Sequence, residues 1–137
     1  MEREALNHYL QQLSTERLQG ECRAIEQHAE IEFIGRPTAQ TMLVPVRDPI
    51  NGGGFFAGEV LVTSCIVKVN NVPGWSMVMD DRPELAGLVA TLDAAFAAGI
   101  RTKEISALAR EGSRMLAQRN SVMNRRTNGT RVSFDLL

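Results

Sequence analysis

The sequence predicts an α+β fold: an antiparallel sheet with an N-terminal helical hairpin, two further helices packed against it and a short C-terminal strand. Two observations support this class. Apolar residues recur every three or four positions near both ends of the chain, which is the spacing of one helix face, whereas β-branched and alternating apolar residues dominate between residues 30 and 79. Helices and strands segregated along the chain in this way are typical of α+β domains. We expect a single domain over residues 1–137, because this length suits one core and no linker or repeat divides the chain.

Two short helices are expected at the N-terminal end, over residues 2–13 and from about residue 15 to residue 27. Ser14 and Thr15 are suitable caps for the second helix. The inward positions of the two helices share an apolar character at helical spacing: Leu6, Leu10, Leu13, Leu18, Cys22 and Ile25. The two helices therefore form a hairpin that buries one face.

The middle of the chain has the patterns of strands. Residues 31–33 and 42–46 alternate apolar and polar side chains, and the intervening Gly35-Arg36-Pro37 indicates a turn, so we expect two antiparallel strands there. Three glycines, 52–54, supply backbone conformations with positive φ and lead into a long strand over residues 56–69. Asn70-Asn71 suits a tight turn with positive φ, so residues 72–79 are expected to pair with that long strand.

Helical spacing returns after residue 80. Asp80 or Asp81 can cap a helix that has Pro83 in its first turn and ends at Gly99. A further helix begins at Thr102 and is expected to weaken through Asn120, Asn124 and Asn128-Gly129. Residues 130–136 alternate again and predict the final strand. The apolar positions of the two helices are Leu85, Leu88, Val89, Leu92, Phe96, Ile105, Leu108, Ala109, Met115 and Leu116.

The formal net charge of −1 conceals an asymmetry along the chain. Residues 1–96 carry seven basic and thirteen acidic side chains, a net charge of −6, whereas residues 97–137 carry eight basic and three acidic side chains, a net charge of +5. A basic C-terminal third can meet a nucleic acid, a phosphorylated metabolite or an acidic partner, or can simply be a solvated helix face. Nucleic acid is the least favoured of these, because no aromatic residue lies among the arginines to stack on a base.

No metal, cofactor or catalytic site is predicted from the spacing of the reactive side chains. His8 and His28 have no partner at metal-ligand spacing and are expected on the surface. Cys22 and Cys65 are far apart and lack a Cys-x-x-Cys motif, which favours buried free thiols. The N-terminus lacks the pattern of a signal peptide, and no apolar run approaches the roughly 20 residues of a membrane span, so a cytoplasmic location is expected.

The remaining polar motifs also have structural explanations. The glycine run lacks the Lys-Ser/Thr ending of a phosphate-binding loop and precedes a strand, which favours a hairpin loop or a subunit contact. Asp80-Asp81-Arg82 is the most polar cluster, and a helix cap accounts for it. Two alternatives stay open at this point: a stand-alone module that binds a small anionic metabolite, and a small enzyme using Asp81 or Glu59 with Arg82.

A series of residues over about three quarters of the chain has a recognisable order and spacing: Gly52-Gly53-Gly54, Phe55-Phe56, Gly58-Glu59-Val60, Val62-Thr63, Cys65, Val67-Lys68-Val69, Gly74, Asp81, Ala86, Leu92-Asp93-Ala94, Thr130-Arg131-Val132 and Phe134. This series resembles the small G subunit of the bacterial carbon-phosphorus lyase core complex, the PhnG family. Ser64 and Met79-Asp80 differ from the residues usual in that family.

The resemblance implies a component of a multi-subunit transferase and lyase complex in phosphonate metabolism. In that complex a larger nucleosidase-like subunit joins methylphosphonate to the ribose of ATP and displaces adenine, giving ribose 1-methylphosphonate 5-triphosphate. The resemblance therefore implies that this larger subunit and the other core subunits are the partners, with no catalytic residue or cofactor in this chain, no nucleic acid and no membrane.

The expected partner interface combines the basic helix with an aromatic anchor. Arg110, Arg114, Arg125 and Arg126 are candidates for a charged docking face. Trp75 is the sole tryptophan and can either fill a pocket on the larger subunit or be buried in the core of this chain, and the sequence favours the core slightly.

Overall fold

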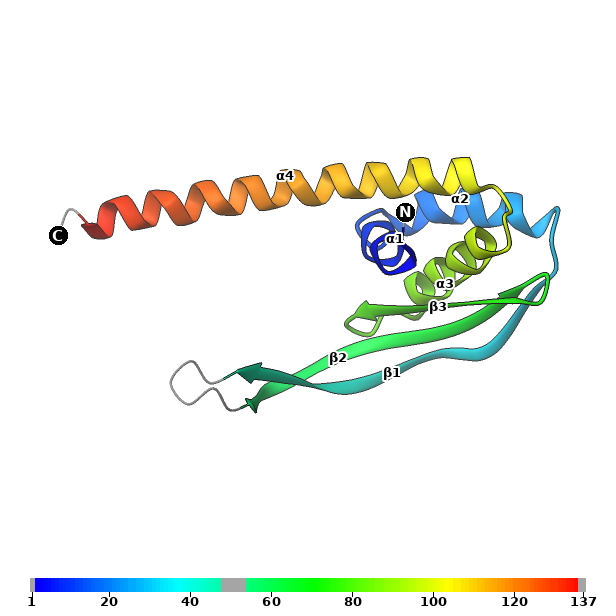
Figure 1. Cartoon of the computed structure of the whole chain (residues 1–137), viewed down its shortest axis with the longest axis horizontal. Coiled ribbons are helices and arrows are strands. Elements are labelled where there is room, and N and C mark those ends of the chain that lie inside the picture. Colours follow the sequence, from blue (N-terminus) through cyan, green and yellow to red (C-terminus); the bar gives the residue numbers. More distant parts are fainter. Residues whose placement is uncertain (1, 48–53, 136–137) are drawn as a thin grey trace.

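The computed structural model describes the backbone of residues 2–47 and 54–135. The described chain is an α+β fold in which two helices precede a three-stranded antiparallel sheet and two helices follow it (Figure 1). The elements are, in order, α1 (Arg3–Leu10), α2 (Thr15–Glu26), β1 (Ile31–Arg47), β2 (Gly54–Val69), β3 (Val72–Met79), α3 (Pro83–Ala97) and α4 (Thr102–Asp135).

The sheet has the order β1-β2-β3, so β2 is central. Directly paired residues of an antiparallel sheet point to the same face, and the pairs Cys65–Ser76 and Val67–Gly74 are buried. Helix α3 packs on this face, and its Ala86 carbonyl accepts a hydrogen bond from Ser76 Oγ at 2.6 Å. The sheet is therefore covered on the α3 face.

The turn between β2 and β3 confirms the prediction made from Asn70-Asn71. The φ angles of these residues are 49° and 67°, in the left-handed region that asparagine tolerates better than most residues. Val69 then pairs with Val72 and closes the hairpin. The predicted glycine loop falls on Gly52 and Gly53, which lie outside the described residues, and Gly54 begins β2.

The prediction of two strands separated by a turn at Gly35-Arg36-Pro37 is wrong. Residues 31–47 form the single strand β1, paired along its length with β2. The register shifts between Phe33 and Gly35 and again between Gly35 and Thr38, so the glycine and the proline occupy irregularities within one strand. Glycine and proline in strands are typical of such bulges as well as of turns, which explains the error.

The N-terminal hairpin forms as expected. Ser14 caps α2 by accepting a hydrogen bond from the Arg17 N–H at 3.3 Å. All six predicted inward residues of the hairpin are buried in the main core, five of them in α1 and α2 and Leu13 between the two helices. Val89 and Leu92 of α3 and Ile105 of α4 belong to the same core. Helix α3 ends at Ala97, and Gly99 follows with a φ of 76°, as its predicted role in the helix end requires.

The prediction that Asp80 or Asp81 caps α3 is wrong. The N-cap residue is Arg82, and its side chain makes no capping hydrogen bond. Thr63 of β2 supplies the contact instead: its hydroxyl accepts from the Arg82 N–H at 2.9 Å and donates to the Asp80 carbonyl at 2.6 Å. A side chain from the neighbouring strand therefore fixes the start of α3.

The predicted C-terminal strand over residues 130–136 is also wrong, because α4 continues to Asp135 and no strand follows β3 within the described residues. A strand needs a neighbouring strand for its backbone hydrogen bonds, whereas a helix satisfies most of its own. The alternation of apolar and polar residues at Val132 and Phe134 is therefore not sufficient for a strand. Among the described residues, no helix is both long enough and apolar enough to cross a membrane.

Two elements project from the body on the same side (Figure 1). The first part of α4 lies against α1 and α3, and the rest of the helix extends past them. The paired ends of β1 and β2 also extend beyond β3 and α3, below the extension of α4. The body of the fold thus carries a helical arm and a strand arm.

Candidate docking surface

The outer edge of β3 is covered by polar side chains of α1. Arg3, Asn7 and Gln11 follow each other at intervals of four, which places them on one side of the helix. Their donors reach three carbonyls spaced two residues apart on β3: those of Pro73 at 3.0 Å, Trp75 at 2.7 Å and Met77 at 2.9 Å. This series satisfies an edge that could otherwise pair with another strand.

Asp93 of α3 completes the attachment of α1. Its carboxylate is 1% exposed and accepts from Arg3 Nε at 3.1 Å and from a second Arg3 nitrogen at 2.8 Å. The same carboxylate accepts from the Trp75 N–H at 3.0 Å. The hydrogen bond to Asp93 raises the pKa of Arg3 above its ordinary value. Asp93 is therefore a structural residue that joins α1, β3 and α3.

The sheet face opposite α3 carries exposed apolar side chains. Ile66 and Trp75 are paired across β2 and β3, and each is 46% exposed. The favoured prediction that Trp75 is buried in the core is wrong, because its strand position places it on the face that α3 does not cover. An exposed apolar sheet face is unusual in a free monomer, where a solvated sheet face is commonly polar.

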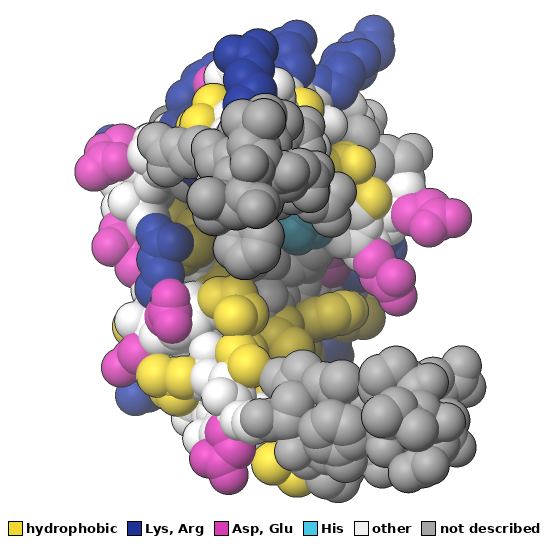
Figure 2. Space-filling model, turned by 90° about the vertical axis from the view of Figure 1, so that its left-hand side faces the viewer, with side chains coloured by type: hydrophobic (Ala, Val, Ile, Leu, Met, Phe, Trp, Pro, Cys, Tyr) yellow, Lys and Arg dark blue, Asp and Glu magenta, His cyan; other side chains and the backbone are white. Residues whose placement is uncertain are grey.

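A cavity of about 590 Å³ adjoins this face, at the end of β3. We call it the sheet pocket. Figure 2 shows hydrophobic side chains in the hollow between α4 and the strand arm, with a histidine beneath α4. The lining residues are predominantly apolar and come from three strands and α1: His8, Gln11, Met42, Leu43, Val60, Val62, Met77, Val78 and Met79.

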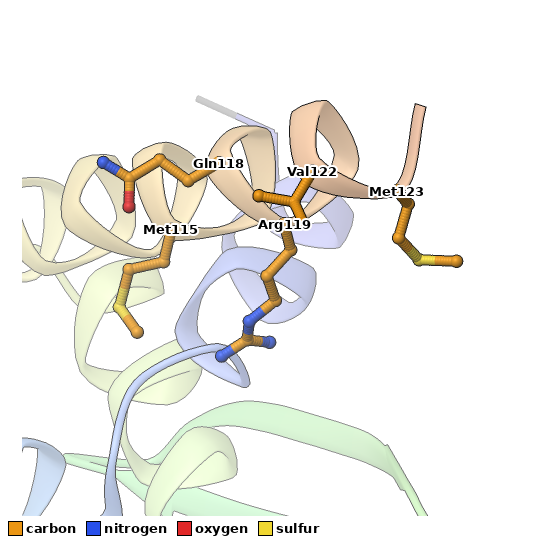
Figure 3. Close-up of a pocket in the computed structure, with 5 residues that line it drawn as sticks. All are labelled: Met115, Gln118, Arg119, Val122 and Met123. Atoms are coloured by element: carbon orange, nitrogen blue, oxygen red, sulfur yellow. The ribbon is translucent and has the colours of Figure 1, made fainter. Parts of the chain in front are cut away.

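A second cavity, of about 430 Å³, lies along α4. We call it the helix pocket, and its lining residues are Met115, Gln118, Arg119, Val122 and Met123. Figure 3 shows the Met115 and Arg119 side chains directed from α4 toward the side where α1 and the strands lie. Arg119 is oriented by Gln12, whose side-chain oxygen accepts from the guanidinium at 2.7 Å.

The sequence prediction named four arginines of α4 and missed the helix pocket. Arg110, Arg114 and Arg125 are exposed, and the side chain of Arg126 lies outside the described side chains. Figure 2 shows basic side chains gathered over α4, on the side away from the hollow. Trp75 lies on the sheet, so the structure does not bring it together with these arginines. The available signal was the apolar spacing, which continues from Met115 to Val122 and Met123.

The remaining candidate residues form no reactive cluster. Asp80, Asp81, Arg82 and Glu59 are exposed, as are both histidines. Within residues 2–47 and 54–135 there is no group of three or more potential metal-ligating side chains.

The two cysteines are buried free thiols, as predicted. Burial raises the pKa of Cys22 to about 12, with smaller contributions from Glu26 and Glu21, and burial also raises the pKa of Cys65. A protonated buried thiol is a poor nucleophile.

The described chain is a small α+β protein with two projecting arms and an exposed apolar sheet face, and exposed apolar patches are common at protein interaction surfaces. The chain is a member of the PhnG family: the family model described as "Phosphonate metabolism protein PhnG" matches residues 1–137. The resemblance found in the sequence is thereby confirmed over the full chain. No curated protein matches the chain significantly.

Proposed function

We propose that the chain is a non-catalytic subunit of a carbon-phosphorus lyase complex. In this role it supports the transfer of methylphosphonate to the ribose of ATP, which displaces adenine and gives ribose 1-methylphosphonate 5-triphosphate. Membership of the PhnG family is the observation that carries the proposal. The larger nucleosidase-like subunit supplies the reacting groups, and this chain docks onto it together with the other core subunits.

The surface of the chain supports a docking role. The sheet pocket and the helix pocket expose methionine, valine and leucine side chains, and exposed apolar patches that have a polar rim are typical of protein interfaces. Methionine is particularly suited to such surfaces because its side chain adapts to the partner. Trp75, at 46% exposed, can act as an aromatic anchor.

The alternative of a stand-alone module for a small anion has less support. A cavity between α2 and α4 brings Arg17 and Arg114 together, but Glu21, Glu104 and Glu111 line the same cavity. Arg17 is also paired with Glu111 at 3.2 Å. Three carboxylates beside two guanidinium groups repel an anionic ligand, so this cavity is better explained as a surface ion-pair network.

Two measurements test the proposed function. A tagged chain purified from its native host is expected to retain the larger subunit, and a complex reconstituted without the chain is expected to lose most of its transferase activity. The purified chain alone is expected neither to hydrolyse ATP nor to cleave phosphonates. ATP turnover by the isolated chain that Asp81→Asn abolishes would instead support a small enzyme.

A further inference from the structure

The helix pocket lies on the side of α4 that is directed toward α1 (Figure 3), and its Arg119 donates a hydrogen bond to Gln12, next to Gln11 of the sheet pocket. We call the space between the two pockets the groove. The sheet forms its floor and the extension of α4 forms its wall. On the floor Met79 is 56% exposed, and on the wall Val122 is 45% exposed. Both surfaces thus offer apolar side chains to a single occupant.

We propose that the groove binds an amphipathic α-helix of a partner subunit, with apolar residues toward the sheet and α4 and carboxylates near Arg119. This inference rests on the proposed function, since it presumes that the chain is part of a complex. It adds the place of docking and the chemistry of the docked segment.

The character of the two surfaces favours a helix over an extended segment. The residues that line the groove offer side chains, those of the sheet and those of one side of α4. The free strand edge nearby belongs to β2, which pairs with β1 alone over residues 54–60 because β3 begins to pair only at Val62. An extended segment that lies on these side chains, and not along the β2 edge, would leave its backbone N–H and C=O groups without partners in an apolar setting, which is costly. A helix satisfies these groups internally.

The spacing on α4 also matches a helical occupant. Met115, Arg119, Val122 and Met123 recur at the intervals of one helix stripe, and such stripes pack against the ridges of another helix. On the floor, the docked helix would cover the open sheet face as α3 covers the opposite one. The sheet would then lie between helices on both sides, which is a common layered arrangement.

The charges of the groove select the occupant. Its lining includes Arg119 and His8 but none of the carboxylate residues among the described side chains. An apolar helix with acidic residues is complementary to this lining, whereas a basic helix is not. A second copy of α4 is therefore a poor occupant, because residues 114–131 of that helix carry five arginines and no acidic residue.

Photo-cross-linking in the native host tests the place of docking. A benzophenone amino acid replaces Val122 in one full-length variant and Met79 in another, and mass spectrometry identifies the cross-linked peptide. Both variants are expected to cross-link to the same segment of one partner subunit, and that segment is expected to have apolar residues at helical spacing with Asp or Glu between them.

Matched positions provide the controls. Asn124 is two residues from Val122 and lies on the opposite side of α4, and Leu61 is adjacent to Val62 and points to the other sheet face. The same label at Asn124 or Leu61 is expected not to reach that segment. Cross-links from Val122 and Met79 to unrelated segments, to a second copy of this chain or to nothing would overturn the inference.

Peptide binding tests the chemistry. The identified segment, made as a synthetic peptide, is expected to bind the full chain and to bind Val122→Asp or Met79→Asp at least about tenfold more weakly, because each places an unpaired charge in an apolar contact. The matched Asn124→Asp and Leu61→Asp variants are expected to change the affinity by less than about twofold. Equal weakening in all four variants, or no binding to the parent chain, contradicts a specific groove.

The failure of this inference differs from the failure of the proposed function. A chain that purifies with the larger subunit but gives no common cross-link from Val122 and Met79 docks by another surface, and only the groove is then rejected. A chain that never associates with the complex removes both proposals.

Discussion

Gly74 marks the closest approach of β3 to α3. A Cβ at this position would lie 2.2 Å from the Ala94 nitrogen and 2.5 Å from Ala94 Cα, so a side chain there requires the helix backbone to move. We expect Gly74→Ala to lower the free energy of unfolding by about 1–3 kcal/mol, measured by urea denaturation. Gly20 is the control, because nothing lies within 4 Å of its added Cβ in α2. Gly20→Ala is expected to stabilise the chain by about 0.5–1 kcal/mol, as alanine is the better helix former.

The buried thiol of Cys22 gives stability a defined pH dependence. Its pKa is raised from 9.0 to about 12, so the folded state retains the proton to higher pH than the unfolded state does. The protonated thiol therefore contributes fully to the free energy of unfolding below pH 9, and this contribution is lost as the pH rises toward 12. Between pH 9 and pH 12, the free energy of unfolding is therefore expected to fall more in the unmodified chain than in the Cys22→Ala variant. The native chain should also react slowly with iodoacetamide at about pH 8, and rapid alkylation without unfolding would contradict the burial.

At the residue scale, the sequence predicted the core better than the candidate site. Leu6, Leu18 and Ile25 were identified because burial repeats with the period of a helix. Trp75 was misplaced, because alternation along a strand separates two faces without indicating which of them a helix covers. The pair Ile66 and Trp75 becomes interpretable only once the register of β2 and β3 and the position of α3 are known.

Among the elements, the helices were predicted in place and the errors occurred where two local structures share the same residue types. Gly35 and Pro37 lie at irregularities of β1, although the same residues are common in turns. The end of α4 was taken for a strand from a short alternation, whereas the helix continues to Asp135. Local sequence does not determine whether Gly35 and Pro37 form a turn or a strand irregularity, or whether the end of α4 is a helix or a strand. Each outcome depends on what lies beside the segment.

The extension of α4 can be tested separately from the body of the fold. Asn124→Pro removes a backbone donor and disfavours the helix over the preceding turn. Because this part of α4 extends past the body (Figure 1), we expect a loss of helical circular dichroism with a change in the free energy of unfolding of less than about 0.5 kcal/mol. Asn124→Ala is the control and is expected to retain the helical signal. A large loss of stability in Asn124→Pro would show that the extension packs on the body in solution.

For the whole molecule, the relation between the two arms could not be predicted from the sequence. Apolar spacing in α4 and in β1 and β2 is visible in the sequence, but it does not reveal that the two arms project on the same side and border one groove (Figures 1 and 2). The asymmetry of charge was visible, with a net charge of +5 over residues 97–137. The structure separates this basic surface from the groove, so a partner can meet them with different parts of its own surface.

The basic surface of α4 gives the last prediction. Reversal of Arg110, Arg114, Arg125 and Arg126 to glutamate is expected to weaken association with the larger subunit at least about tenfold, because it places like charges against an acidic partner. The variant should remain folded, since exposed charges contribute little to stability. A pull-down at two salt concentrations measures the effect, and salt should weaken the parent complex more than the variant complex.

The matched control reverses four other cations, Arg23, Arg36, Arg82 and Lys103. If both reversals weaken the complex equally, total charge is responsible. If the α4 reversal retains the partner as well as the parent does, these arginines only solvate the helix and another surface of the chain holds the complex.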